Sequence, residues 1–269
     1  MKAEIQPIGI FDSGVGGLTV LQALRERIPG ERFLYLGDTA RLPYGSKSPT
    51  TVRRYALNAA AHLAGHDVKL LVVACNTASS EALDEVTGAS PVPVVGVVEP
   101  GVRAGLATGA GRIGVIGTEG TIRSGAYQRA LARLAPEIGV RATPCPLFVP
   151  LAEEGWGDHP VTDEIARHYL GPLLDWGAEA LILGCTHYPL LKPSLQRVVG
   201  PDVVLVDSAS SVAEAVIGDH SELVDASGQH DGDVHIQLTD ASDRFLRILR
   251  AILGRDPEHL EVVDIEGVA

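Results

Sequence analysis

Short apolar runs rich in β-branched residues alternate with longer, Ala/Leu-rich stretches along most of this chain. The runs include IGIF, LLVVA, RIGVIG and EALILG. Between them, stretches such as TVRRYALNAAAHLAG and TDEIARHYLGPLLDWG carry apolar residues at helical spacing. Strand–helix alternation of this kind predicts an α/β fold with mostly parallel sheets. At 269 residues, the chain is long enough for one large domain or two smaller ones.

Two motifs recur in the same order at similar offsets. IGIFDSG at residues 8–14 resembles IGVIGTEG at residues 113–120, and LLVVACNT at residues 70–77 resembles LILGCTH at residues 181–187. The recurrence predicts two related α/β halves. Chance similarity between buried strands is the alternative explanation.

Polar side chains follow seven of the apolar runs directly. They are Asp12, Asp38, Cys75, Glu99, Thr118, Cys185 and Asp207. Ligands of open parallel sheets bind outside the carboxyl ends of the strands. These positions therefore predict the rim of a cleft.

The DSGVGG segment, residues 12–17, is predicted to be a strand-to-helix turn, with a helix that starts near Leu18. Its glycines permit tight backbone geometry and the close approach of a ligand. The segment lacks both the GxGxxG pattern and a Lys–Ser/Thr pair, so it is no nucleotide loop of the usual kinds. Asp12 or Ser13 either caps the helix or binds a ligand, and spacing leaves both roles open.

A polar loop, residues 37–48, follows the second apolar run and contains Tyr44 and Gly45. Such a loop at the strand ends either covers a site or serves as an ordinary surface connection.

The two cysteine motifs, ACNTASS and GCTHYP, each place a thiol after an apolar run and before a predicted helix start. A helix N-terminus stabilises the thiolate, so we expect a lowered pKa for Cys75 and Cys185. The residues that follow each thiol supply additional polar groups: Asn76, Thr77, Thr186 and His187. A lone cysteine in such a place is more often a buried structural residue. We assign that structural role to Cys145, in TPCPLF.

The two thiols are compatible with three kinds of chemistry. Cys75, Cys185 and His187 offer metal ligands, but no short Cys-x-x-Cys spacing supports zinc. A redox pair lacks the same spacing. In the third alternative, one thiol from each half removes or returns a proton on opposite faces of one carbon, which inverts that centre.

Charge and composition exclude several classes of partner and location. The net charge of −12 disfavours nucleic acid as a primary partner. The acidic segment DPEHLEVVDIE, residues 256–266, is interpreted as solvated surface. No apolar run is long enough to span a bilayer, and the start of the sequence lacks the pattern of a signal peptide. A cytoplasmic location with reduced thiols is therefore expected.

Several segments resemble glutamate racemases of the cofactor-independent aspartate/glutamate racemase family. In chain order these segments are IGIFDSGVGGLTV, GDTARLPYGSKS, ACNTAS, GVVEPG, IGVIGTEGTI, CPLFVPLAEEG and GCTHYPLL. The resemblance extends from Ile8 to about Asp207. It implies an enzyme without cofactor or metal that interconverts L- and D-glutamate and supplies D-glutamate for peptidoglycan synthesis. It also implies two similar α/β domains, related by a pseudo-twofold axis, with the active site in the cleft between them. We map the first domain to residues 1–99 plus 209–269 and the second to residues 100–208.

The resemblance also implies roles for individual residues. Cys75 handles the proton of D-glutamate and Cys185 that of L-glutamate, while Asp12 and His187 assist beside them. Glu153 matches a further catalytic acid of the family, and the adjacent Glu154 is the alternative match for the same position. The implied substrate-binding residues are Asp12, Ser13, Tyr44, Gly45, Asn76, Thr77, Thr118, Thr121, Thr186 and His187.

The α-proton of an amino acid is a very weak acid, and neither Lys47 nor Lys69 has the context of a pyridoxal-binding lysine. Catalysis then depends on preorganised hydrogen-bond donors, a closed cleft that excludes water, and thiols whose pKa values are adjusted by their surroundings. The alternatives are a racemase of aspartate or hydantoins, or a partner-binding protein such as a gyrase inhibitor. The resemblance leaves a homodimer open.

Overall fold

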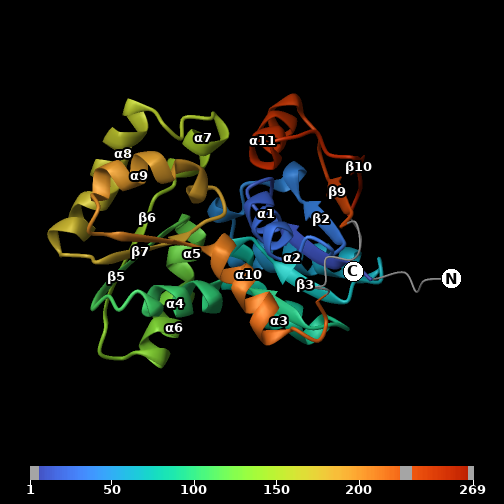
Figure 1. Ribbon diagram of the computed structural model, residues 1–269, viewed down its shortest axis with the longest axis horizontal. Helices are drawn as coiled ribbons and strands as arrows, with labels where there is room; N and C mark the ends of the chain where they lie inside the picture. The colour runs from blue at the N-terminus through green and yellow to red at the C-terminus, as the bar shows by residue number, and fades with distance from the viewer. Residues whose placement is uncertain (1–5, 225–231, 266–269) are drawn as a thin grey trace.

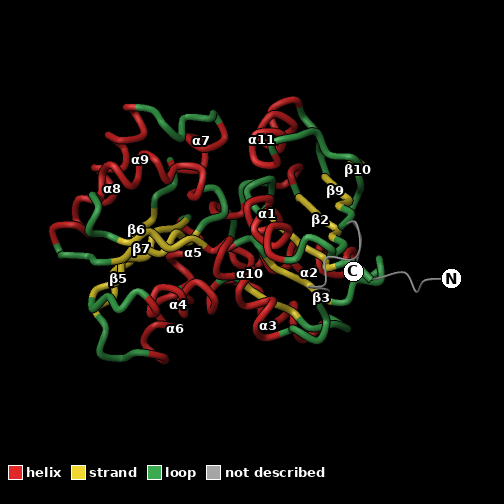
Figure 2. The backbone as a smooth tube through the Cα atoms, in the orientation of Figure 1, coloured by secondary structure: helices red, strands yellow, loops and turns green. Residues whose placement is uncertain are grey.

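The computed structural model describes residues 6–224 and 232–265, and in this part of the chain the strands form two entirely parallel sheets (Figures 1 and 2). The first sheet has the order β10-β9-β2-β1-β3-β4, with strands β1 (Ile8–Asp12), β2 (Phe33–Gly37), β3 (Leu70–Val73), β4 (Val94–Gly96), β9 (Val234–Leu238) and β10 (His259–Val262). The second has the order β6-β5-β7-β8, with strands β5 (Arg112–Gly117), β6 (Gly139–Pro144), β7 (Ala180–Gly184) and β8 (Val204–Asp207). The predicted α/β class with parallel sheets is confirmed.

The two sheets repeat one topology. The order β2-β1-β3-β4 in the first sheet matches β6-β5-β7-β8 in the second, so β1 corresponds to β5 and β3 to β7. These are the strands that carry the recurring sequence motifs. Strands β9 and β10 extend the first sheet beyond the shared pattern.

Helices connect the strands and cover the sheets. They are α1 (Leu18–Arg27), α2 (Pro49–Ala64), α3 (Asn76–Ala89), α4 (Val98–Ala107), α5 (Glu119–Ser124), α6 (Ala126–Leu134), α7 (Phe148–Glu153), α8 (Pro160–Asp175), α9 (Lys192–Val199), α10 (Ser208–Asp219) and α11 (Asp243–Leu253). Short 3₁₀ helices span Thr39–Arg41, Tyr44–Ser46 and Tyr188–Leu191. Ser48, Thr118 and Ser242 cap α2, α5 and α11 by accepting a backbone N–H, which satisfies a donor that the first turn leaves free.

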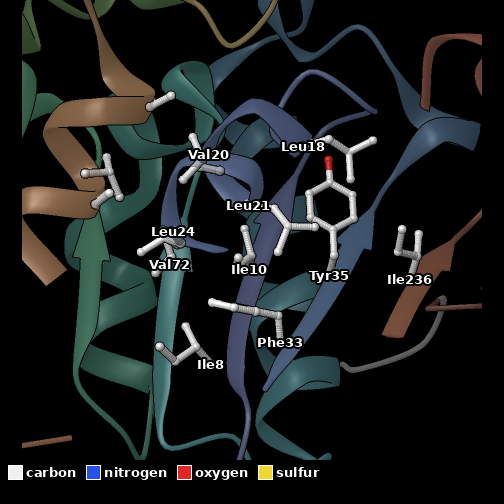
Figure 3. Close-up of a cluster of buried hydrophobic side chains, with 14 of the residues drawn as sticks. Ile8, Ile10, Leu18, Val20, Leu21, Leu24, Phe33, Tyr35, Val72 and Ile236 are labelled. Carbon is white, nitrogen blue, oxygen red and sulfur yellow. The ribbon is translucent and has the colours of Figure 1, made fainter. Parts of the chain in front are cut away.

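Alternating side chains place an apolar core on each face of the first sheet. Ile8 and Ile10 of β1 pack with α1, α10 and α11 in the cluster that Figure 3 shows, whereas Phe11 packs with α2 and α3 on the other face. The second sheet divides its core in the same way. Because each fully buried aliphatic or aromatic side chain contributes about 1.5–3 kcal/mol, both faces of each sheet need helical cover.

Helix α10 lies between the two sheets in Figure 1 and packs against both α1 and α4. Helix α4 packs in turn on β7 and β8 of the second sheet. The domain boundaries at residues 99/100 and 208/209 remain a prediction.

The acidic segment 256–266 was interpreted as solvated surface, and the acidic side chains of its described part, Asp256, Glu258, Glu261 and Asp264, are exposed. Strand β10 forms within it, pairs with β9, and is followed by Ile265, which is buried in the core. The charge pattern gave no indication of this strand, because His259, Glu261 and Val262 are exposed while their backbone pairs with β9. Charged side chains are common on edge strands, where they discourage pairing with other chains.

None of the helices in residues 6–224 and 232–265 combines the length and apolar character that a bilayer span requires.

Candidate active site

Both cysteines of the recurring motifs line one small pocket at the carboxyl ends of the parallel strands. Cys75 follows β3 and Cys185 follows β7, the equivalent strands of the two sheets. The cavity is about 20 Å³, which is room for about one water molecule. Its walls are Ser13, Gly14, Leu42, Pro43, Tyr44, Gly45, Cys75, Asn76, Thr77, Thr118, Val149, Glu153, Cys185, Thr186 and His187.

Cys75 is buried at the N-terminus of α3. Its sulfur accepts a hydrogen bond from the Ala78 N–H at 3.4 Å and lies 3.4 Å from the Ser13 hydroxyl. Burial of the thiol and, to a smaller extent, the negative charge of Asp12 raise the pKa of Cys75 to about 12. The predicted lowering of this pKa is therefore wrong, because loss of hydration outweighs the helix terminus.

Asp12 lies fully buried behind the pocket wall rather than in it. Its carboxylate accepts the Gly14 N–H at 3.0 Å and the Thr186 hydroxyl at 3.3 Å. Helix α1 begins at Leu18 without any side-chain cap. Of the two roles considered for Asp12, helix capping is excluded, and the contact with Thr186 instead joins the two cysteine-containing halves.

His187 connects Cys185 to an acid. Its Nδ1 lies 3.9 Å from the Cys185 sulfur and its Nε2 lies 3.3 Å from Glu153 Oε1. Burial alone disfavours the protonated ring, but the hydrogen bond to Cys185 and the nearby carboxylate of Glu153 outweigh it and raise the pKa of His187 to about 10. The raised pKa favours the imidazolium form, which carries a positive charge beside the Cys185 sulfur.

The two adjacent glutamates occupy different environments. The Glu153 side chain is 9% exposed and reaches His187, whereas the Glu154 side chain is 54% exposed. Burial opposes ionisation of Glu153, but the adjacent His187 and the charge of Arg244 outweigh it and lower the pKa of Glu153. Geometry thus places Glu153, and not Glu154, at the pocket.

Comparison with known proteins identifies the family to which this chain belongs. A family model described as Asp/Glu/Hydantoin racemase matches residues 17–216, well over half of the chain. The chain belongs to the Asp/Glu/hydantoin racemase family.

Relatives of this racemase share most of its length. A glutamate racemase of Geobacter metallireducens is 52% identical over 250 residues, or 92% of each chain, and one of Syntrophus aciditrophicus is 48% identical over 97% of this chain and 98% of its own. The crystal structure of glutamate racemase from Francisella tularensis in complex with D-glutamate superposes with a TM-score of 0.90 at 35% identity, covering 97% and 98% of the two chains. An aspartate racemase of Picrophilus torridus, at 16% identity and a TM-score of 0.58, shares the fold alone.

Three threonine hydroxyls form a cluster on one wall of the racemase pocket. Thr77 lies 2.9 Å from Thr118 and 3.3 Å from Thr121, and Thr118 lies 3.1 Å from Thr121. Thr121 itself stands behind the wall. Because Thr77 precedes the second sheet and the other two follow β5, the cluster also joins the two halves.

Two further predicted residues of the wall also form hydrogen bonds within the protein. The Tyr44 hydroxyl donates to Asp38 Oδ2 at 2.5 Å, so this side chain is part of the pocket wall. The neighbouring Gly45 lines the pocket through its backbone. Asn76 accepts from the Tyr127 hydroxyl at 2.6 Å and donates to Ser208 at 3.3 Å. The loop at residues 37–48 therefore covers the site and is no plain surface connection.

Four of the seven predicted rim residues do not line the pocket, and one of these is the buried Asp12 described above. Asp38 is held by Tyr44, Glu99 pairs with Arg103 on the surface of α4, and Asp207 caps α10 and pairs with Lys192. A polar residue after a strand caps the next helix as readily as it lines a cleft, so position along the chain does not distinguish the two roles.

Other wall residues were missing from the sequence prediction. Gly14, Leu42, Pro43 and Val149 line the pocket, and Arg244 contacts Glu153 from behind. The apolar walls carry no chemical signature, and Arg244 is far from Glu153 along the chain. The position of Gly14 beside Ser13, and that of Leu42 and Pro43 in the loop at residues 37–48, were the signals that the sequence offered.

Proposed function

We propose that this racemase interconverts L- and D-glutamate by a two-base mechanism in which Cys75 and Cys185 act on opposite faces of the α-carbon. The observation that supports this most directly is that both thiols, which follow equivalent strands of two repeated sheets, line one pocket. A repeated unit that faces its copy presents the same chemical group to both sides of a bound molecule.

In the direction from L- to D-glutamate, Cys185 acts as the thiolate and removes the α-proton. The Cys75 thiol then donates its proton to the opposite face, which leaves Cys75 as the thiolate and Cys185 as the thiol. The reverse direction starts from that second state. The raised pKa of Cys75 suits the donor role, and the imidazolium of His187 beside Cys185 suits the base role.

Removal of the α-proton leaves negative charge on the substrate carboxylate, which the pocket must stabilise. We assign this to the polar groups of the wall, which need no cluster of basic residues. They are the side chains of Ser13, Asn76, Thr77, Thr118 and Thr186 and the backbone at Gly45. Thr121 positions Thr77 and Thr118 from behind, and Asp12 and His187 assist proton movement at their respective thiols.

A cavity of about 20 Å³ cannot hold glutamate, so the two halves must part to admit it. The contacts that would break and reform are those across the pocket, between Thr186 and Asp12 and between Thr77 and Thr118. Closure expels water and shortens the distance between each thiol and the α-carbon. We propose that the division into residues 1–99 plus 209–269 and 100–208 describes the two moving parts.

Racemisation of glutamate is tested by circular dichroism at a wavelength that follows either enantiomer, with aspartate and a hydantoin as competing substrates. Glutamate should be turned over much faster than the other two. Preference for aspartate would contradict the substrate assignment while leaving the two-thiol mechanism standing. Full inversion by a Cys75→Ala or Cys185→Ala variant would contradict the mechanism itself.

In this proposal the D-glutamate formed serves peptidoglycan synthesis. We place the enzyme in the cytoplasm, where its three free thiols stay reduced. Cell fractionation with an antibody checks the location.

A further inference from the structure

Away from the pocket, two histidine rings stack at the outer edge of the first sheet. His235 on β9 and His259 on β10 are direct neighbours in the parallel register, with ring centroids 4.5 Å apart and planes inclined by 13°. The Asp233 carboxylate faces both rings, 2.8 Å from His235 Nε2 and 3.7 Å from His259 Nε2. One ligand atom from each residue lies within 4.8 Å of the other two.

We propose that Asp233, His235 and His259 bind a divalent cation of borderline softness, with Zn²⁺ as the representative ion. Imidazole nitrogen and carboxylate oxygen are preferred zinc donors, and tetrahedral coordination at 2.0–2.1 Å sets the donor atoms about 3.3 Å apart. The observed spacings bracket this value, so small side-chain rotations complete the triad. The side chains are 32–55% exposed, which gives the ion access and leaves the fourth position to water.

The ion would stabilise the pairing of the edge strand β10 with β9 in the first sheet. Strand β10 is four residues long and, among residues 6–224 and 232–265, pairs only with β9. Coordination would link the two strands through side chains as well as through the backbone, and would hold in place the segment that carries the buried Ile265. Because the ion would bind the folded state alone, it should raise the unfolding temperature as its concentration increases.

The experiment titrates Zn²⁺ into the wild-type chain and into His235→Asn and His259→Asn by calorimetry, with thermal unfolding measured in parallel. We expect one zinc per wild-type chain with a rise in the unfolding temperature, and loss of both in each variant. His168→Asn, on the exposed face of α8, is the matched control and should behave as wild type.

Co²⁺ distinguishes this site from the catalytic thiols, because thiolate ligation produces an intense charge-transfer band in the near ultraviolet and His/Asp ligation does not. A d–d spectrum without that band, lost in His235→Asn, supports the proposal. Wild-type stoichiometry in both histidine variants would overturn it. So would the absence of binding to the wild-type chain, or a thiolate band that disappears in Cys75→Ser.

An independent observation concerns Arg244, and the inference from it rests on the proposed function. Arg244 lies on α11, beside the first sheet, while Glu153 ends α7, beside the second; the two helices face each other in Figure 1. Arg244 Nη2 lies 3.1 Å from Glu153 Oε2 and 3.0 Å from Glu154 Oε1. The guanidinium therefore spans the two halves next to the pocket.

The two oxygens of Glu153 serve different partners. Oε1 faces His187 and Oε2 faces Arg244, and His187 in turn contacts Cys185. We infer that Arg244 is a positioning residue that orients the Glu153 carboxylate toward His187 and makes this orientation depend on closure of the two halves. When the halves part, the contact between α11 and Glu153 breaks, so the charge arrangement beside Cys185 is complete only in the closed form.

Arg244→Gln and Arg244→Lys test this, with Arg250→Gln as the control because Arg250 lies on the same helix and pairs with the exposed Asp256. The Gln variant should lose about tenfold or more in kcat, the size of one charge-assisted hydrogen bond, with little change in KM. Loss of the positive charge raises the pKa of Glu153, so the acid limb of the kcat profile should move to higher pH. Arg244→Lys should restore most of kcat and return the acid limb of the pH profile toward its wild-type position. The control Arg250→Gln should match wild type.

An unchanged pH profile in Arg244→Gln, or equal impairment of the Gln and Lys variants, would overturn the role of Arg244 while wild-type racemisation still supports the proposed function. A wild-type chain that does not exchange the α-proton of glutamate would instead overturn the proposed function, and this inference with it.

Discussion

Glu153 Oε1 lies 3.3 Å from His187 Nε2, across two elements that are separated along the chain. Glu153 ends α7 and His187 follows β7, so the contact exists only after the second sheet has assembled. It fixes the imidazole with its other nitrogen toward the Cys185 sulfur. The pair therefore determines how that thiol can act.

Replacement of one thiol should leave exchange on one face only. In heavy water, Cys185→Ala should take up deuterium at the α-carbon of D-glutamate without inversion, because Cys75 remains, and Cys75→Ala should do so with L-glutamate. Inversion should fall by about 10³-fold or more in both. Proton NMR and chiral chromatography of the same samples measure the two processes. Exchange of both enantiomers by either variant would mean that another group serves as the missing base.

Loss of the acid behind His187 should slow the reaction far more than loss of its neighbour. Glu153→Gln removes the charge that stabilises the imidazolium, so kcat should fall by about 10²-fold. Glu154→Gln removes only an exposed ion pair and should cost less than about fivefold. Initial rates at saturating substrate make the comparison. Comparable losses in the two variants would refute the assignment of Glu153.

His187 should also contribute pH-dependent stability. Its pKa is about 10 in the folded protein against an ordinary 6.5, so the folded state binds the proton more tightly. This contribution is fully present below pH 6.5 and is lost as the pH rises toward 10. Urea unfolding of wild type and His187→Gln should therefore show a stability gap that shrinks across that interval. The exposed His168→Gln serves as control; a gap that stays constant with pH is the contrary result.

Gly16 allows the DSGVGG loop to pack against the second cysteine motif. A Cβ atom at this position would lie 2.5 Å from Thr186 Oγ1 and 2.7 Å from His187 Nδ1. Gly16→Ala should cost about 1–3 kcal/mol of stability or displace His187, and kcat should fall in either case. Gly88→Ala, in α3 with open space around it, should instead stabilise by about 0.5–1 kcal/mol. Thermal unfolding and initial rates check both variants, and normal activity in Gly16→Ala would show that the loop can yield.

The pattern of apolar residues along the chain determined the secondary structure of this protein. The β-branched runs and the Ala/Leu-rich stretches predicted strands such as β1, β3, β5 and β7 and long helices such as α2 and α8, because side-chain period follows directly from backbone geometry. The recurrence of the cysteine motifs placed Cys75 and Cys185 after equivalent strands. Parallel pairing then places each thiol at the carboxyl edge of its own sheet, whereas the expectation that the two edges share one site came from the family resemblance.

Tertiary structure decided what those groups can do. Neighbouring positions such as Glu153 and Glu154 differ by about 100° around a helix axis, and only packing shows which one faces the pocket. The raised pKa of Cys75 arises from burial and from Asp12, and the contact of Arg244 with Glu153 joins segments far apart along the chain. Burial and charge–charge distance are properties of the assembled molecule, whereas spacing along the chain records only which face of its own element a residue occupies.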